Sequence, residues 1–127
     1  MGRDFVLDSS AVLAVINSER GEEKVVTRFP HSVISSVNLA EILTKLAERK
    51  VNLHSALDYF LKVGLEVIEF NTDQALECAA LRPLTKHLGL SLGDRACLAL
   101  AIQENATAVT ADKMWANLNV CKVEVIR

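Results

Sequence analysis

The sequence predicts an α/β domain with a mostly parallel, doubly wound sheet. Short apolar segments that suit buried strands alternate with longer segments of helical periodicity along the whole chain. The 127 residues are enough for one sizeable core but not for two, so residues 1–127 are expected to form a single domain. No internal repeat or low-complexity segment interrupts the alternation.

The first half of the chain contains two predicted strands, each followed by helical sequence. Residues 4–8 and 31–37 are rich in the apolar and β-branched side chains of buried strands. Helical spacing follows, most clearly where Ile42 and Leu46 lie on one face of the same segment. Pro30 ends the short helix before the second strand. The predicted helices of this half cover residues 9–19, 22–29 and 38–50.

The second half continues the alternation. Gly64 is suited to close a helix, and Pro83 breaks another. The segment 92–105 is apolar on nearly every side, which predicts a helix packed on several sides. Residues 84–89 are predicted to be a short connector, and Met114 and Trp115 to lie in a turn of helix. The predicted helices cover residues 53–64, 72–82 and 92–105, and the strands residues 65–70, 106–111 and 122–126.

Charge and composition limit the possible functions. Fourteen basic and 16 acidic residues give a net charge of −2, so the broad positive surface of many nucleic-acid-binding proteins is absent. A polyanion would have to bind through a local patch or through metal ions. No apolar run approaches the roughly 18 residues that a membrane span requires, and no secretory signal is visible. Cys78, Cys97 and Cys121 are therefore expected to be reduced core residues of a cytoplasmic protein.

Four acids lie where strands pass into helices. Asp8 ends the first strand, and Asp112 directly follows strand 106–111. Asp94 opens the helix 92–105, and Glu41 lies in the opening turns of the helix after the second strand. Because ligands gather outside the carboxyl ends of the strands in such sheets, we expect these acids to form a site there.

Each acid also has a plain structural interpretation. Asp8 and Asp112 are suited to cap the helices that follow them. The spacing of Asn38 to Glu41 and of Ser91 to Asp94 resembles a capping box, and Glu41 could instead pair with Lys45 one turn later. Four independent caps on one edge of one sheet would be a coincidence, so the group as a whole favours a functional site.

A divalent cation explains why carboxylates would be grouped. Carboxylates within a few ångströms repel one another and raise each other's pKa, and a hard cation removes that cost. Oxygen ligands without His or Cys favour Mg²⁺ or Mn²⁺ over zinc. Such an ion can activate a water molecule and stabilise charge on a phosphate during its transfer.

At these residues the chain resembles the PIN-domain family, specifically the VapC-type toxins of toxin–antitoxin pairs, from end to end. The segments that carry the resemblance are "FVLDSSAVLAVI", "SSVNLAEIL", "GLSLGDRACLALA", "AVTADKMWANL" and "VEVIR". It implies a three-layer α/β/α domain and metal-dependent hydrolysis of RNA. Asp8 and Asp94 would be the principal metal ligands, and Glu41 and Asp112 would complete the acidic cluster. It also implies a homodimer that a cognate VapB-type antitoxin silences.

Several further residues are candidates for supporting roles. By resemblance Thr110 belongs to the fourth motif, and Asn117 stands in a region where some family members carry another acid, which leaves the number of metals open. Ser9 is placed either to orient a metal-bound water or to cap a helix. Arg95 and Lys113 each follow a site acid and could reach a phosphate, although exposed charges on helices are the favoured interpretation. Trp115 could stack on a base, although core or dimer packing is the favoured interpretation.

Three rival functions agree less well with the sequence. A haloacid-dehalogenase-type phosphatase needs a second Asp two positions after the first, where this chain has Ser10. A phospho-receiver domain needs an acidic pair and an acceptor Asp that "LDSSA" and "VISSV" do not supply. A catalytically inert PIN-like module would only bind RNA or a protein partner, and the four intact acids argue against it.

Overall fold

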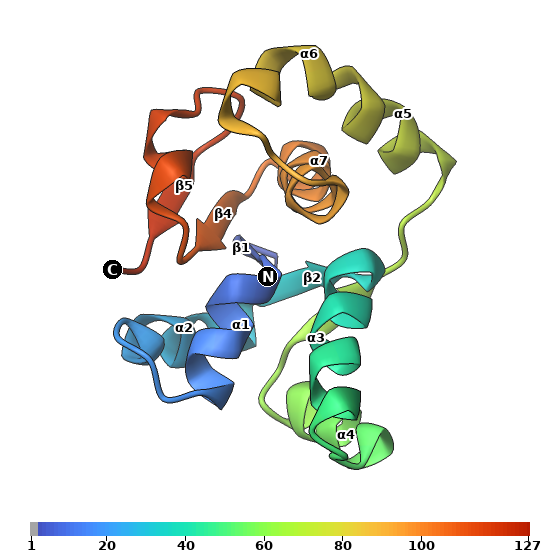
Figure 1. Ribbon diagram of the computed structural model, residues 1–127, viewed down its shortest axis with the longest axis vertical. Coiled ribbons are helices and arrows are strands. Elements are labelled where there is room, and N and C mark those ends of the chain that lie inside the picture. The colour runs from blue at the N-terminus through green and yellow to red at the C-terminus, as the bar shows by residue number, and fades with distance from the viewer. Residues whose placement is uncertain (1–2) are drawn as a thin grey trace.

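A computed structural model describes residues 3–127 (Figure 1). Its centre is a five-stranded sheet in which every strand pairs in parallel with its neighbours, in the order β3-β2-β1-β4-β5. The parallel, doubly wound sheet that the sequence predicts is therefore confirmed. The strands are β1 (Phe5–Leu7), β2 (Ser32–Ser35), β3 (Glu66–Ile68), β4 (Thr107–Thr110) and β5 (Val123–Val125).

Helices cover both faces of the sheet, so the fold has three layers (Figure 1). Successive residues of a strand point to opposite faces, and Leu7 packs with one helical layer while Val6 packs with the other. The first layer contains α1 (Ser9–Ile16), α2 (Glu22–Arg28), α3 (Ser36–Glu48) and α4 (Leu53–Lys62), and the second α5 (Thr72–Ala80), α6 (Arg82–Thr85) and α7 (Leu92–Glu104). Short 3₁₀ turns are η1 (Phe29–His31), η2 (Lys86–Leu88) and η3 (Lys113–Asn117).

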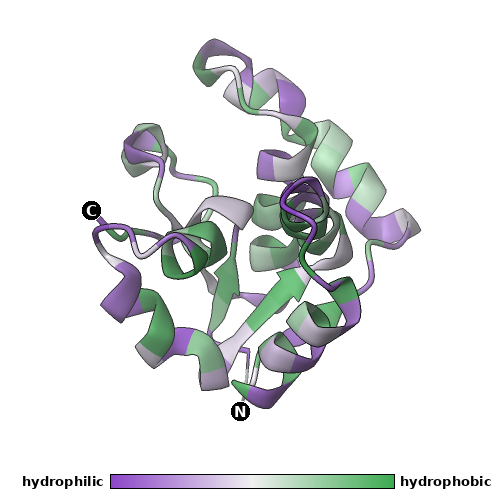
Figure 2. Cartoon of the chain, turned by 60° about the horizontal axis from the view of Figure 1, so that its bottom comes forward, coloured by the Kyte–Doolittle hydropathy of each residue, from purple (hydrophilic) through white to green (hydrophobic). Residues whose placement is uncertain are grey.

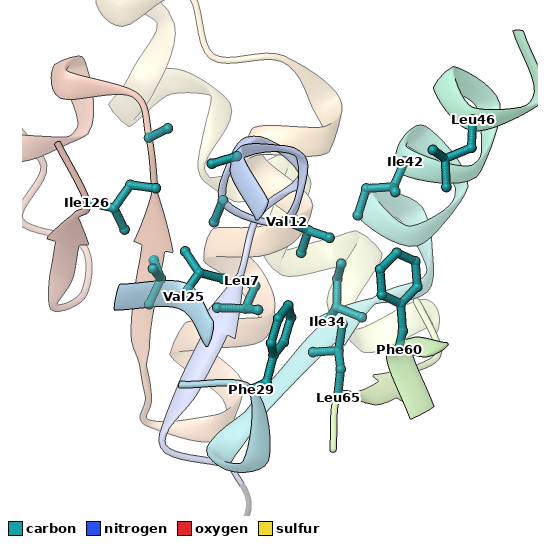
Figure 3. Packing of buried hydrophobic residues seen from close by; sticks show 14 residues of the cluster. Leu7, Val12, Val25, Phe29, Ile34, Ile42, Leu46, Phe60, Leu65 and Ile126 are labelled. Carbon is teal, nitrogen blue, oxygen red and sulfur yellow. The ribbon is translucent and has the colours of Figure 1, made fainter. Parts of the chain in front are cut away.

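Each helical layer buries its own apolar core against the sheet. Figure 3 shows Phe29 and Phe60 closing the first core beside Ile34 of β2. The second core is centred on α7, whose residues from Ala96 to Ala101 are fully buried. Apolar colour accordingly fills the strands and inner helix faces, and hydrophilic colour lies on the outside (Figure 2). The sequence correctly predicted that the 92–105 helix is packed on several sides.

The cysteines and Trp115 lie where a core interpretation places them. Cys78 and Cys97 are buried and Cys121 is partly buried, and none of these thiols is in a disulfide within residues 3–127. Trp115 has no exposed surface and packs in the second core, so it cannot stack on a base in this conformation. In the part of the chain described, no helix has the length and apolarity needed to cross a membrane.

Two local predictions need correction. Residues 84–89 are not a plain connector, because Pro83 lies in the first turn of the one-turn helix α6, where its missing N–H is not needed. Helix α3 begins at Ser36, two residues earlier than predicted, because the Ser35 hydroxyl caps it by accepting a hydrogen bond from the Val37 amide (3.2 Å). Asn38 and Glu41 therefore do not form a capping box.

The strand order defines where a ligand can bind. From β1 the chain builds outward through β2 to β3, and it later adds β4 and β5 on the other side of β1. The order reverses between β1 and β4, and in sheets of this kind a crevice opens there beyond the strand ends. Asp8 directly follows β1, and Ala111 and Asp112 directly follow β4. These segments therefore lie at the position that the topology favours for a site.

Candidate active site

Asp8 is the buried centre of this position. Only 4% of its surface is exposed, and it caps α1 by accepting a hydrogen bond from the Ala11 amide at 2.8 Å. The Ser10 hydroxyl donates to the same carboxylate at 2.7 Å. Thr110, at the end of β4, donates to its other oxygen at 2.6 Å and so bridges β1 and β4. Asp8 is thus both a helix cap and an acid held in a fixed orientation.

Burial raises the pKa of Asp8 from 3.8 to about 6. The hydrogen bonds from Thr110, Ser10 and Ala11 oppose this effect, because they stabilise the charged form. The negative charge of Asp94 raises the pKa further. The ionised carboxylate is therefore costly to keep in the folded chain, and a cation next to it would remove that cost.

Asp94 lies at the start of α7, on the same side of the molecule. It forms a capping box with Ser91, in which its carboxylate accepts from the Ser91 amide at 2.9 Å. Cys97 lies one turn further along α7. Burial raises the pKa of its thiol, and the negative charges of Asp8, Asp94 and Glu41 raise this pKa further. The Glu41 carboxylate lies against Gly93, the residue before Asp94, so two of the four acids lie at the first turn of α7.

Glu41 reaches this region from α3. Asn38 donates to its Oε1 atom at 2.9 Å, and the Ser9 hydroxyl donates to the same oxygen. Within the described residues no ion pair joins Glu41 to Lys45, so the alternative pairing does not form. The side chain of Glu41 is partly buried and is oriented by polar contacts with α1 and α3.

Asp112 occupies the outer side of the site. It is exposed, and its Oδ1 atom caps η3 by accepting from the Met114 amide at 2.9 Å. Its backbone amide donates to the Thr110 hydroxyl at 3.0 Å, and this hydroxyl in turn donates to Asp8. A hydrogen-bonded chain therefore connects Asp112 to Asp8, although the Asp112 carboxylate itself lies at the surface.

The supporting residues fall into distinct places. The Arg95 guanidinium donates to the Cys78 carbonyl of α5 at 3.1 Å, so one of its nitrogens is already occupied by a protein acceptor. Lys113 and Asn117 are exposed in η3, and Lys113 remains available to a polyanion. The sequence did not single out Ser10 as a site residue. Its position at i+2 from Asp8 is the available signal, because a hydroxyl there can reach the carboxylate, whereas the sequence comparison with phosphatases concerns only the absence of a second acid at this position.

The donor set was tested for a metal ion. Among residues 3–127, no three His, Cys, Asp or Glu side chains lie close enough together to bind one ion. The four carboxylates are therefore not gathered into a single ligand cage. Mg²⁺ is usually held by one or two carboxylates and keeps several waters. Asp8 and Asp94 are both acids, and the negative charge of Asp94 disfavours ionisation of Asp8. Their oxygen atoms are therefore suited to such an ion.

A groove of about 740 Å³ adjoins the site. It runs along α3 from Glu41 past Thr44 and Lys45, with the start of α7 as its other wall. Leu92, at the beginning of α7, is 57% exposed and forms part of that wall. Glu41 is the one site acid among the residues that line the groove, so it is open to an extended ligand on the α3 side.

Comparison with known proteins identifies relatives of this arrangement. The model of the family described as "PIN domain" matches residues 5–120. No curated protein is similar enough to the chain to count as a match.

Solved structures resemble the chain over nearly its whole length. VapBC2 from Rickettsia felis, bound to a DNA fragment from its promoter, contains a chain 25% identical to this one, with a TM-score of 0.76 and coverage of 97% of this chain and 98% of that chain. A toxin–antitoxin complex from Klebsiella pneumoniae gives 19% identity, a TM-score of 0.77 and coverage of 96% and 97%. DNA-bound VapBC from Salmonella typhimurium gives 18%, 0.73 and 98% of both chains.

Proposed function

The chain belongs to the PIN-domain family, and from this premise we propose that it is a VapC-type toxin that cleaves RNA with the help of Mg²⁺ or Mn²⁺. The observation that carries the proposal is the buried carboxylate of Asp8, held at the reversal point of the sheet beside the charge of Asp94. The solved toxin–antitoxin complexes that resemble the chain support the same function.

The residues of the site would divide the work as follows. Asp8 and Asp94 would hold the ion, and the hydroxyls of Ser10 and Thr110 keep the Asp8 carboxylate in its orientation. When bound, the ion would supply an activated water and stabilise negative charge on the scissile phosphate. Glu41, oriented by Ser9 and Asn38, would face the substrate from the α3 side.

The exposed residues of η3 would contact the RNA. The Asp112 carboxylate lies at the surface and would complete the acidic cluster when substrate and metal are present. Lys113, directly after it, would contact a backbone phosphate, which the net negative chain otherwise repels. Arg95 is the weaker candidate, because its guanidinium is already bound to the Cys78 carbonyl.

The proposed partners follow from the same relatives. We expect a VapB-type antitoxin to silence the protein, since VapBC complexes are among the structural neighbours. A homodimer in the cytoplasm is the further expectation that the family resemblance implies. An acidic pocket also binds a guanidinium well, because its planar fork matches a carboxylate in two parallel hydrogen bonds. An antitoxin that places an Arg among the acids would exclude the metal and block the phosphate together.

A cleavage assay tests the proposed function. The purified protein should cleave RNA when Mg²⁺ or Mn²⁺ is present and should stop when EDTA is added. Mapping the new 5′ ends would identify the RNA and the sequence at which it is cut. An inert PIN-like module would bind RNA in a gel-shift experiment but leave it intact under every metal condition, and that result would overturn the proposed activity.

Metal binding should also stabilise the folded chain. At about 100 times its dissociation constant, Mg²⁺ or Mn²⁺ should raise the free energy of unfolding by roughly 2.7 kcal/mol. Asp94→Asn should lose most of this gain, although its amide oxygen can still accept the capping hydrogen bond from Ser91. Thermal unfolding with and without metal measures the effect. Asp58→Asn, which removes an exposed acid from α4, is the control and should respond like the wild type.

A further inference from the structure

The carboxylate of Glu41 is held against the backbone of another helix. A Cβ atom added to Gly93 in the first turn of α7 would lie 2.6 Å from both the carboxyl carbon and Oε1 of Glu41, and closer still to Oε2. Real Cβ atoms do not come so near, so the carboxylate occupies space that exists only because residue 93 has no side chain. Gly93 directly precedes Asp94 in the chain.

Asn38 ties the same carboxylate to the same residue. It is 1% exposed, and its side-chain nitrogen donates to Glu41 Oε1 at 2.9 Å and to the Gly93 carbonyl at 3.0 Å. These two acceptors fix the orientation of the amide, because a flipped amide would direct its oxygen at two other oxygens. The Ser9 hydroxyl of α1 contacts both the Asn38 carbonyl and Glu41. Three helices therefore meet at one carboxylate.

Packing alone does not explain this choice of residues. Glycine is an unfavourable residue inside a helix, and alanine would be better there if nothing opposed it. A buried amide must find partners that an apolar side chain would not need. Both unfavourable residues contact Glu41, and through it they hold the α3 acid at the start of α7, next to Asp94.

We propose that Asn38 and Gly93 are positioning residues for Glu41. Asn38 pins one carboxylate oxygen, and Gly93 leaves the space that the carboxylate fills. A free Glu side chain samples many rotamers, and restricting it to one of them costs conformational entropy. If the folded protein already restricts it, this entropy is not lost when substrate binds. This inference rests on the proposed ribonuclease function, but the contacts that it describes can be tested without any cleavage assay.

A thermodynamic cycle tests the contact between Gly93 and Glu41. In the wild type, Gly93→Ala must displace the carboxylate and break its hydrogen bonds, which offsets the gain in helix propensity. In a Glu41→Ala background nothing opposes the new methyl group. Gly93→Ala should therefore raise the melting temperature by more in Glu41→Ala than in the wild type. Equal shifts in the two backgrounds would overturn the proposed contact, whether or not the protein cleaves RNA.

Cleavage kinetics test the positioning role. Asn38→Ala should lower kcat by about 10–100-fold, as is typical when a residue that orients a site ligand is lost, with little change in KM because Asn38 is buried. In a Glu41→Ala background the further loss should disappear, because there is no carboxylate left to position. A loss of the same size in both backgrounds would show that Asn38 acts only on the fold.

The chain offers a matched control. Gln74 of α5 is also 1% exposed, donates through its amide nitrogen to a backbone carbonyl (Glu69, 3.1 Å) and, like Asn38, has a buried amide oxygen without a partner among the described residues. Gln74→Ala should lower the melting temperature but leave kcat per folded molecule unchanged. If it lowered kcat as much as Asn38→Ala does, a general loss of packing would explain both results, and the positioning role would be wrong.

Discussion

Replacing Asp8 by Asn is expected to reduce RNA cleavage by at least about 1,000-fold, which corresponds to roughly 4 kcal/mol of lost transition-state stabilisation. The proposed role of Asp8 is to hold the metal ion through a carboxylate that is 4% exposed. An amide of the same shape has no charge with which to hold a divalent cation. No other acid of the site is as deeply buried.

The same substitution should preserve the fold. An Asn oxygen can still accept the capping hydrogen bond from the Ala11 amide, and the hydroxyls of Ser10 and Thr110 can each accept a hydrogen bond as well as donate one. Circular dichroism and thermal unfolding provide the check on folding, and initial cleavage rates with excess Mg²⁺ provide the measurement. Asp58→Asn on the surface of α4 should cleave at the wild-type rate. Cleavage by a folded, metal-replete Asp8→Asn protein at that rate would exclude Asp8 as a metal ligand.

The stability of the metal-free protein should depend on pH through Asp8. Burial raises the pKa of Asp8 from 3.8 to about 6, so the folded chain binds a proton more tightly than the unfolded chain. The stabilisation that this proton provides is fully present below pH 3.8 and is lost as the pH rises through about 6. The gap between the two pKa values corresponds to a change of roughly 3 kcal/mol in the free energy of unfolding between full protonation and full ionisation of Asp8.

A comparison with Asp8→Asn isolates this effect from the other titrating groups. In EDTA, the free energy of unfolding of the wild type minus that of Asp8→Asn should fall by roughly 2.4 kcal/mol between pH 4 and pH 7.5, slightly less than the full gap because the unfolded carboxyl is already partly ionised at pH 4. Urea denaturation at a series of pH values measures it. A difference that does not change with pH for Asp8 would mean that its buried carboxylate is not held in a costly charged form.

Much of the fold could be predicted because it depends on local patterns. The spacing of apolar residues marks each helix, and runs of β-branched residues mark each strand, without any knowledge of their neighbours. The caps Asp8, Ser91 and Asp112 are local as well, since each bonds an amide two or three residues along the chain. The exceptions were α6, a one-turn helix with Pro83 in its first turn, and the start of α3, which the Ser35 cap places two residues earlier than the apolar pattern does.

The contacts of the site are less predictable than its members. The sequence places four acids near one edge of a parallel sheet, but it does not say how closely they approach. In the structure the Glu41 carboxylate lies against the first turn of α7, which contains Asp94, and Asp8 is buried at the end of β1, whereas the Asp112 carboxylate is exposed. Long-range packing decides which acids lie close together and which are exposed, because it sets the distances between the helices and strands that carry them.

The sequence by itself determined the α/β class, the order of the elements and the identity of the acids, because these follow from periodicity and from strand-to-helix junctions. Only the tertiary structure decided which side chain serves which acid. Ser9 and Ser10 are neighbours in the chain, yet Ser9 donates to Glu41 and Ser10 donates to Asp8. The reason is that successive residues of a helix point about 100° apart, so each meets a different helix or strand. The contact of Gly93 with Glu41, 52 residues earlier in the chain, likewise exists only because α3 and α7 pack together.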